Sequence, residues 1–336
     1  MRTLAFFTIL SVVSSYVYNV TVSNKGAIPS LSLKRSSPGN SPCTCTFNPS
    51  FLEPQPGNPG LNASILILRA SGCPANYGGN EDHLMFAYCD KNGNCGDLQP
   101  LVFPFEASAE DPRAFYYPTD GKWYLYYFAN GPGQNTVYLR RSATPLDPNS
   151  WELVVSQLPW HRNGCVILRD DGNHYVIYGE SGGPSKGPLP GIAIAQTRNF
   201  VNYTVLNATW LEPYGANGTQ SEIVLEAASN VVQLSTGDYL HIYAAGTNGW
   251  VANGNYTGAA IILDKDDPTK ILQRTNHIFL PTMDYEIGDG IWPVQRNRTL
   301  FVTSLIPVEG ETDTFRVYYG AADANVATAI LTVTYQ

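Results

Sequence analysis

Short runs in which apolar and polar residues alternate, separated by turn residues, occupy most of the chain. Clear examples are residues 123–128, 174–178, 239–244 and 315–319, which are rich in aromatic and β-branched side chains. A period of two over such short runs is typical of strands, and no stretch keeps a helical period over three turns. The pattern therefore predicts an all-β protein.

Five similar strand pairs recur along the chain, each around a turn that contains Gly or Asn. These Gly and Asn positions follow one another at intervals of 61, 51, 65 and 60 residues. The spacing predicts five four-stranded sheets around one axis, a five-bladed β-propeller, whereas the alternative β-sandwich does not need so even a spacing. The predicted turns are Pro59-Gly60, Asp120-Gly121, Asp171-Gly172, Thr236-Gly237 and Arg296-Asn297.

The N-terminal segment lacks this pattern and is organised like a secretory signal peptide. Residues 1–18 contain a basic residue, an apolar run over residues 4–13 and then two serines. The run is too short to cross a bilayer about 30 Å thick as a helix, so a signal anchor is the weaker alternative. We expect residues 19–46 to form an irregular lead-in and residues 47–336 to form one propeller domain.

The cysteines and glycosylation motifs also favour export. Six cysteines follow the predicted signal, and their spacing does not match a zinc site, so we predict up to three disulfides with undetermined pairing. Cys165 lies far from the others in sequence and is the candidate free thiol. We therefore expect a secreted, extracellular glycoprotein without membrane attachment, or one in a lytic compartment. Asn-x-Ser/Thr motifs occur at Asn19, Asn62, Asn202, Asn207, Asn217, Asn255 and Asn297.

Composition narrows the class of ligand. Charged residues make up 14% of the chain, against about 25% in an average globular protein, and the net charge is −8. Because there is no basic stripe, nucleic acid is a poor partner. Aromatic residues make up 12% of the chain, with 21 tyrosines. Such a surface suits neutral ligands such as sugars, and no cofactor is expected.

The sequence Glu110-Asp111-Pro112-Arg113 precedes an aromatic strand and is the first candidate for chemistry. Proline fixes φ and has no N–H group, so it fits the beginning of a strand and holds Asp111 there. A like charge and an opposite charge flank Asp111, and both can change its pKa. A surface turn with a local ion pair is the simpler alternative.

The propeller prediction brings other polar residues to the same place. In a propeller the first strand of each blade lines the central channel, so positions at similar offsets from the turns converge. Asp111 lies 10 residues before Gly121. Carboxylates, an arginine and an amide at similar offsets form a constellation that suits glycoside chemistry. These residues, 8 to 12 positions before the other turns, are Asn48, Arg162, Glu226 and Asp289.

At this point the chain resembles glycoside hydrolase family 130, whose members are β-mannoside phosphorylases and β-mannosidases built as five-bladed propellers. The resemblance runs from residue 47 to residue 329, and the order of the motifs makes it specific. The motifs are Phe47-Asn48-Pro49, Leu66-Ile67-Leu68-Arg69, Glu110-Asp111-Pro112-Arg113, His161-Arg162-Asn163, residues 263–270 and Val317-Tyr318-Tyr319-Gly320-Ala321-Ala322-Asp323.

The resemblance implies a role for each matching residue. Asp111 would be the general acid and would protonate the leaving oxygen through a hydroxyl group of the bound mannose. The carboxylates in residues 264–267 have calcium-like spacing but match a family turn, so no metal is expected. The predicted sugar-binding residues are Asn48, Arg69, Glu110, Arg113, Arg162, Asn163, Asp289 and Asp323.

The group that attacks the sugar decides between hydrolysis and phosphorolysis. Family phosphorylases hold phosphate with a basic cluster, of which only Arg162 is clearly present, and Ala244 follows Tyr243 where a histidine is usual. Glu222 and Glu226 occupy the segment where a lysine is expected, as in hydrolytic members of the family.

We therefore predict an inverting β-mannosidase that acts on β-1,2- or β-1,4-linked mannosides of an oligosaccharide or mannan. Asp111 is the predicted acid, and Glu222 or Glu226 the base that activates water. The alternatives are a phosphorylase, a mannosyltransferase, or a carbohydrate-binding propeller without activity. The sequence leaves the linkage and the oligomeric state open.

Overall fold

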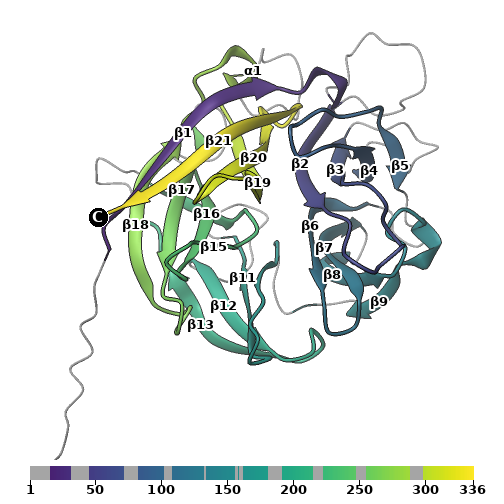
Figure 1. Ribbon diagram of the computed structural model, residues 1–336, viewed down its shortest axis with the longest axis horizontal. Coiled ribbons are helices and arrows are strands. Elements are labelled where there is room, and N and C mark those ends of the chain that lie inside the picture. The colour runs from purple at the N-terminus through teal and green to yellow at the C-terminus, as the bar shows by residue number, and fades with distance from the viewer. Residues whose placement is uncertain are drawn as a thin grey trace, which may run out of the picture.

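The structure is a computed structural model that describes residues 16–31, 45–71, 82–101, 108–131, 134–155, 158, 162–180, 191–214, 222–246, 255–287 and 298–336. In this part of the chain, five antiparallel sheets lie around a common centre and form a five-bladed β-propeller (Figure 1). The predicted fold class is therefore confirmed. Across the described residues, helical structure is limited to α1 (Asp284–Ile287) and two 3-10 turns, Pro29–Leu31 and Pro148–Ser150.

We number the blades in chain order, and in each blade the first strand lies nearest the centre. Blade one comprises β2 (Cys45–Leu52), β3 (Ile65–Ser71), β4 (His83–Tyr88) and β5 (Gln99–Leu101). Blade two comprises β6 (Glu110–Tyr117), β7 (Lys122–Gly131), β8 (Gln134–Ser142) and β9 (Glu152–Val155). Blade three comprises β10 (Cys165–Ile167), β11 (His174–Tyr178), β12 (Ile192–Thr197) and β13 (Tyr203–Leu211).

The last two blades differ in detail from the first three. Blade four comprises β14 (Val224–Ala227), β16 (Tyr239–Gly246), β17 (Tyr256–Leu263) and β18 (Ile271–Phe279), and the short β15 (Val232–Gln233) also pairs with β16. Blade five comprises β19 (Leu300–Pro307), β20 (Thr314–Ala321), β21 (Asn325–Tyr335) and β1 (Tyr18–Ala27).

Strand β1 closes the propeller by joining the two ends of the chain. It pairs with β21 from Tyr18↔Tyr335 to Ala27↔Ala327, and the two strands run side by side in Figure 1. The expectation of an irregular lead-in over residues 19–46 is thus wrong for residues 19–27. The strand depends on a partner more than 300 residues away, which local composition does not reveal. Residues 1–15 of the predicted signal peptide and residues 32–44 of the predicted lead-in lie outside the described residues.

Four of the five predicted turns lie between the first and second strands of blades one to four. The fifth assignment is wrong, because Arg296-Asn297 precedes β19. The corresponding turn of blade five is residues 308–313, where Gly310 has a φ of 80° and Val308 N–H donates to Thr314 O at 2.9 Å. The offset that selected Asp289 therefore has no basis, and Asp289 itself lies outside the described residues.

The core lies between neighbouring blades, because both faces of each sheet are buried. On β7, Trp123 and Leu125 pack against blade one, whereas Tyr124 and Tyr126 pack on the opposite face against blade three. Strand side chains alternate between the two faces, so a continuous apolar run fills both interfaces. The same arrangement continues around the ring and holds the inner strands in fixed positions.

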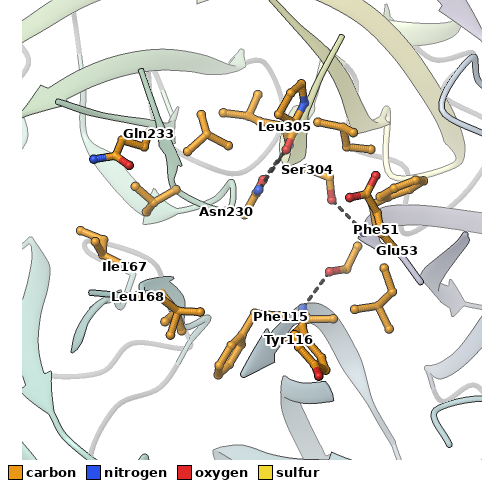
Figure 2. Close-up of a pocket in the computed structure, with 18 of the residues that line it drawn as sticks. Phe51, Glu53, Phe115, Tyr116, Ile167, Leu168, Asn230, Gln233, Ser304 and Leu305 are labelled. Atoms are coloured by element: carbon orange, nitrogen blue, oxygen red, sulfur yellow. Dashed lines mark hydrogen bonds between the residues drawn. The ribbon is translucent and has the colours of Figure 1, made fainter. Parts of the chain in front are cut away.

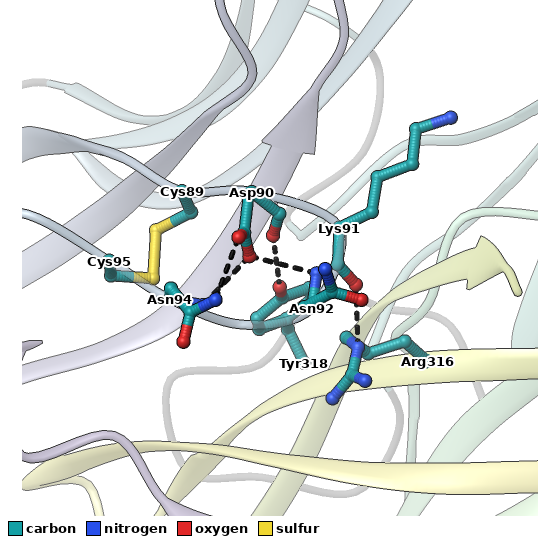
Figure 3. Close-up of a disulfide and its surroundings, with 8 residues drawn as sticks. All are labelled: Cys89, Asp90, Lys91, Asn92, Asn94, Cys95, Arg316 and Tyr318. Carbon is teal, nitrogen blue, oxygen red and sulfur yellow. Dashed lines mark hydrogen bonds between the residues drawn. A yellow bond between two sulfur atoms is a disulfide. The ribbon is translucent and has the colours of Figure 1, made fainter.

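A disulfide between Cys89 and Cys95 closes the loop between β4 and β5 (Figure 3). This loop contacts blade five: Arg316 Nε donates to Lys91 O at 2.6 Å, and Tyr318 Oη donates to Asp90 O at 3.2 Å. The contact therefore supports the junction between the first and last blades.

The other cysteines differ in their settings. Cys165 is buried and free, as expected, and Cys45 is buried, whereas Cys43 and Cys73 lie outside the described residues. One disulfide, Cys89–Cys95, is thus present, where the sequence predicted up to three with the pairing left open. Within the described ranges, no helix has the length and apolar character to cross a membrane.

Candidate active site

Two Asn/Asp-Pro pairs begin the site, one on each of the first two inner strands. Asn48 has a φ of 50° and precedes Pro49, and Asp111 has a φ of 52° and precedes Pro112. The strand register shifts at both places, so each pair forms a β-bulge. A left-handed φ is uncommon outside glycine, but Asn and Asp tolerate it better than other residues. Such strain costs on the order of 1–3 kcal/mol and is typical of functional sites.

Asp111 lies at the centre of a buried cluster of charges. Its carboxylate accepts hydrogen bonds from Asn48 Nδ2 at 2.7 Å, Arg69 Nη1 at 3.1 Å and Arg162 Nη1 at 2.8 Å. Both arginines also form ion pairs with the neighbouring Glu110, at 3.1 and 2.9 Å. Two guanidinium groups thus bridge two adjacent carboxylates.

The cluster determines the charge of Asp111. Burial alone would raise the pKa of Asp111, but Arg69, Arg162 and Arg113 together with the bond from Asn48 outweigh it and hold the pKa well below its usual value. The same two bridging arginines outweigh burial at Glu110 and lower its pKa. Asp111 is therefore ionised at neutral pH.

A second pair of carboxylates faces this cluster across Arg162. Glu226 is buried and accepts hydrogen bonds from Tyr256 Oη and Asn163 Nδ2, both at 2.7 Å. Glu180 forms a β-bridge with Glu226, and its carboxylate lies 3.6 Å from Arg162 Nε. Burial, followed by the charge of Glu180, raises the pKa of Glu226 to about 8. Glu226 therefore retains its proton at neutral pH.

These groups surround a cavity of about 80 Å³. Its wall also needs Gly320, because a Cβ atom at that position would lie 2.3 Å from Asn48 Oδ1. The lining residues are Phe47, Asn48, Arg69, Asp111, Arg162, Glu180, Glu226, Tyr256, Thr299, Phe301 and Asp323. Within the described part of the chain, no group of His, Cys, Asp and Glu is arranged to hold a metal ion.

A larger cavity of about 390 Å³ opens at the other end of the inner strands (Figure 2). Among the described residues that line it, Glu53 has the one charged side chain, and Glu53 pairs with Lys91 at 2.9 Å. The side chain of Asn230 exchanges hydrogen bonds of 3.0 and 2.6 Å with the backbone of Leu305. This cavity has no pair of carboxylates, so the smaller one is the candidate active site.

Comparison with known proteins identifies similar sequences and similar folds. No protein-family model matches the chain. Over 180 residues the chain is 28% identical to the β-1,4-mannooligosaccharide phosphorylase of Ruminococcus albus, a match that covers 52% of this chain and 49% of the relative. The chain thus spans about half the length of this curated relative.

Solved structures resemble the whole propeller. The β-1,2-mannobiose phosphorylase of Listeria innocua has a TM-score of 0.68 at 17% identity, with 93% of this chain and 96% of that chain covered. A second structure comes from work on family 130 glycoside hydrolases that target β-1,2 mannosidic linkages in Candida mannan. It has a TM-score of 0.68 at 17% identity, with 96% of this chain and 95% of that chain covered. A glycosyl hydrolase of Bacteroides ovatus has a TM-score of 0.69 at 16% identity, covering 92% of each chain.

The resemblance to glycoside hydrolase family 130 is confirmed. Over about half of its length the chain is similar to a mannoside phosphorylase. Five of the six motifs contribute residues to the wall of one cavity, namely Phe47, Asn48, Arg69, Asp111, Arg162 and Asp323. Glu110 lies behind the cavity and holds the two arginines, and Asn163 holds Glu226. The predicted site residues that line the cavity are Asn48, Arg69, Asp111, Arg162, Glu226 and Asp323.

Arg113 does not line the cavity, contrary to the sugar-binding role implied by the resemblance. Its Nε donates to Ala228 O at 2.7 Å and its Nη1 donates to Pro112 O at 2.9 Å. Its guanidinium also lies 5.2 Å from the ring centre of Phe301. The bulge between Glu110 and Arg113 breaks the alternation of β6, so Arg113 need not share a face with Asp111. Through these two hydrogen bonds Arg113 links the backbone beside Asp111 to the backbone that follows Glu226.

Glu222 also lies outside the cavity, so the structure separates the two candidate bases. Its side chain is fully buried between blades three and four. It accepts hydrogen bonds from Tyr243 Oη at 2.8 Å and Tyr214 N–H at 3.2 Å, contacts His277 Nε2 at 3.1 Å and pairs with Arg274. These partners occupy both carboxylate oxygens. Of the two glutamates, only Glu226 faces Asp111 and Arg162.

Sequence reasoning missed three residues that contact the charged groups of the site. Glu180 follows the second strand of its blade, and the offset rule counted only along first strands. Tyr256 begins β17, and its signal in the sequence is no different from that of other strand tyrosines. Asp82 immediately precedes β4 and forms an ion pair with Arg69 at 2.5 Å. Burial is the largest effect on its carboxyl group and raises the pKa of Asp82 to about 6.

Proposed function

We propose that this chain is an inverting glycoside hydrolase that acts on β-mannosides with β-1,2 or β-1,4 linkages. The observation that carries the proposal is the carboxylate pair Glu180 and Glu226 opposite Asp111. A phosphate dianion in this cavity would face the carboxylate of Glu180, and also that of Glu226 whenever Glu226 is ionised, as a base must be. Arg162 in the cavity wall is already paired with Glu110, Asp111 and Glu180. A neutral water molecule meets no such repulsion, and a carboxylate can activate it.

Each group has a defined part in the proposed reaction. Glu226 removes a proton from water while the water oxygen forms a bond with the anomeric carbon of the mannoside. The bond from that carbon to the leaving oxygen breaks on the opposite side, and Asp111 supplies the proton to this oxygen through a sugar hydroxyl group. A single displacement of this kind inverts the anomeric configuration. Arg69, Asn48 and Asp323 hold the sugar from the cavity wall.

The pKa values place the proton on Glu226 and a negative charge on Asp111, the reverse of what the reaction requires. The working form has the same number of protons, with one moved from Glu226 to Asp111. A sugar hydroxyl placed between Asp111 and its arginines would weaken their contacts and so raise the pKa of Asp111. Because the two groups interact, the pH dependence of the rate reports values that belong to the pair.

Product analysis with and without phosphate tests the proposal. The substrates are β-1,2- and β-1,4-mannobiose, and the anomer formed first is identified by NMR. Free α-mannose that forms at the same rate without phosphate, and is lost in Asp111→Asn and Glu226→Gln, is the expected result. Mannose 1-phosphate that appears only with phosphate would overturn the hydrolase. A first product in the β configuration would overturn the inverting mechanism.

The second candidate is a β-mannoside phosphorylase, which the similarity to the Ruminococcus albus enzyme favours. It requires phosphate beside Arg162, with Glu226 keeping its proton and Glu180 neutral or displaced. Glu180→Gln separates the two candidates. The substitution should weaken a hydrolase by disturbing its base, whereas it should strengthen phosphate binding to a phosphorylase by removing a negative charge.

A further inference from the structure

The outer strand of blade three is unusual among the outer strands of the propeller. Strand β13 is nine residues long, contains no Asp, Glu, Lys or Arg and lies at the outer rim (Figure 1). An exposed strand edge is a template for pairing with another chain, and proteins protect such edges with charge, proline or short length. The other outer strands have at least one of these protections: Lys25 in β1, Pro100 in the three-residue β5, Glu152 in β9 and Arg274 in β18.

Aliphatic side chains gather at this unprotected edge. Val201, Val205 and Leu206 are 50%, 46% and 43% exposed. The register between β12 and β13 shifts around Leu206, so neighbouring side chains of β13 both point away from the core. The shift gives the edge some twist, but it adds neither charge nor cover. In the described part of the chain no strand pairs with the outer side of β13, and this edge carries an exposed apolar surface.

Two glycosylation motifs flank this apolar stretch. Asn202 and Asn207 are both exposed, and each is followed two positions later by a threonine. In the second motif Asn207 Oδ1 accepts a hydrogen bond from Thr209 N–H at 2.9 Å and lies 3.4 Å from Thr209 Oγ1. The register pairs Asn207 with Ile194 and Val205 with Ala195, so these two side chains point to opposite faces of the sheet, and a sugar on Asn207 would begin next to Leu206 in the bulge.

We propose that Asn202 and Asn207 carry N-linked glycans that cover the edge of β13 and prevent it from pairing with other chains. In the transfer, Asn Nδ2 forms a bond with C1 of an N-acetylglucosamine whose donor is a lipid-linked oligosaccharide diphosphate. The bond from C1 to the diphosphate oxygen breaks, the lipid diphosphate leaves with the electron pair, and the amide loses a proton to solvent. The inference requires the proposed secretory route, and it does not depend on the catalytic proposal.

The motif at Asn255 has the opposite setting, and we infer that it carries no glycan. Tyr256, its middle residue, is buried and lines the candidate active site. Thr257 is 1% exposed, and its hydroxyl contacts Ala245 O at 3.2 Å and His277 Nδ1 at 2.8 Å. A glycan here would have to fit against the packed wall of the cavity.

The first test is a measurement of glycan occupancy. The full chain with its own N-terminal segment is expressed in a eukaryotic secretory host. Enzymatic glycan removal converts each occupied asparagine to aspartate, which mass spectrometry detects. We expect occupancy at Asn202 and Asn207 and none at Asn255. Failure of the chain to be secreted, or secretion with Asn202 and Asn207 empty, would overturn the proposal.

The second test measures the protective role. Light scattering should show at least several-fold faster aggregation of the Asn202→Gln/Asn207→Gln double variant than of the parent. Asn62→Gln, which removes an exposed motif away from β13, serves as the matched control and should behave like the parent. Adding Leu206→Lys to the double variant should restore solubility, because a charge then protects the same edge. A double variant that aggregates no faster than the parent would show that the glycans do not shield this strand.

Discussion

Replacing Glu226 with glutamine should abolish turnover and at the same time stabilise the fold at neutral and alkaline pH. The carboxylate is buried and accepts hydrogen bonds from Tyr256 Oη and Asn163 Nδ2. Glutamine has nearly the same shape: its oxygen can face Asn163, and its amide can donate to Tyr256 Oη, since a hydroxyl group can also accept. The variant keeps the packing and loses only the ionisation.

The magnitude follows from the pKa of Glu226, which rises from 4.5 to about 8 on folding. The folded protein therefore holds a proton that the unfolded chain releases, so stability falls as pH rises from about 4.5 to about 8. Each pKa unit corresponds to about 1.36 kcal/mol, which gives a penalty of about 5 kcal/mol above pH 8. Glutamine does not titrate, so the advantage of the variant should be absent near pH 4.5 and fully developed above pH 8.

The assay compares denaturant unfolding of the parent and Glu226→Gln from pH 4.5 to pH 9, with hydrolysis measured in parallel. Removal of a general base should lower kcat by about 10²- to 10⁴-fold. A stability difference that does not change between pH 5 and pH 9 would refute the reasoning, because it would mean that Glu226 does not titrate in this range. Retention of full turnover would refute its role as the base.

Glu222→Gln is the matched control and should have the opposite effect on stability. Burial opposes ionisation of Glu222, but the bond to His277 and the charge of Arg274 outweigh it and lower its pKa. Its contribution to stability is therefore present above the ordinary glutamate pKa and lost as pH falls through the folded value. Breaking its buried pair with Arg274 should cost about 3–5 kcal/mol at neutral pH. A stabilised Glu222→Gln would contradict this account.

Three further substitutions test individual contacts. Arg113→Lys should lower kcat about 10-fold or more with little change in KM, because a misplacement of catalytic groups slows the reaction more than it weakens substrate binding. A higher KM with unchanged kcat would instead indicate that Arg113 contacts the sugar directly. Cys89→Ser/Cys95→Ser should lower the free energy of unfolding by about 2 kcal/mol, as expected for a short closed loop, and an unchanged denaturation midpoint would contradict this. Gly320→Ala should displace the Asn48 side chain and reduce kcat/KM for mannobiose, because the added Cβ atom would overlap with Asn48 Oδ1. Unchanged kinetics would show that β2 can move to make room for it.

The sequence was sufficient to predict the propeller and the residues on its inner strands. The period of the turns placed Asp111, Asn48, Arg162 and Glu226 at equivalent positions, and the structure brings these four residues to one cavity. The four residues converge because each lies in, or just before, the first strand of a blade, where the geometry repeats. It missed Glu180, which follows a second strand and therefore has no equivalent offset.

The choice between Glu222 and Glu226 could not be made from the sequence. The two residues are four positions apart and would share a face if both lay in one strand. Strand β14 begins only at Val224, so Glu222 precedes it and turns between the blades toward Arg274. Strand β1 was missed for a similar reason, since its partner β21 lies at the other end of the chain.

The positions that break local rules are also those that define the site. Asn48 and Asp111 have left-handed backbones immediately before proline, a combination that strand propensity and proline geometry both disfavour. The surrounding contacts compensate: Asn48 Nδ2 donates to Asp111, and two arginines hold the carboxylate. The strain is therefore tied to the charge on Asp111, because removing that charge weakens the contacts that stabilise both bulges. Protonation of Asp111 during the proposed reaction would release part of this restraint, so the backbone geometry and the proton transfer act on the same residue.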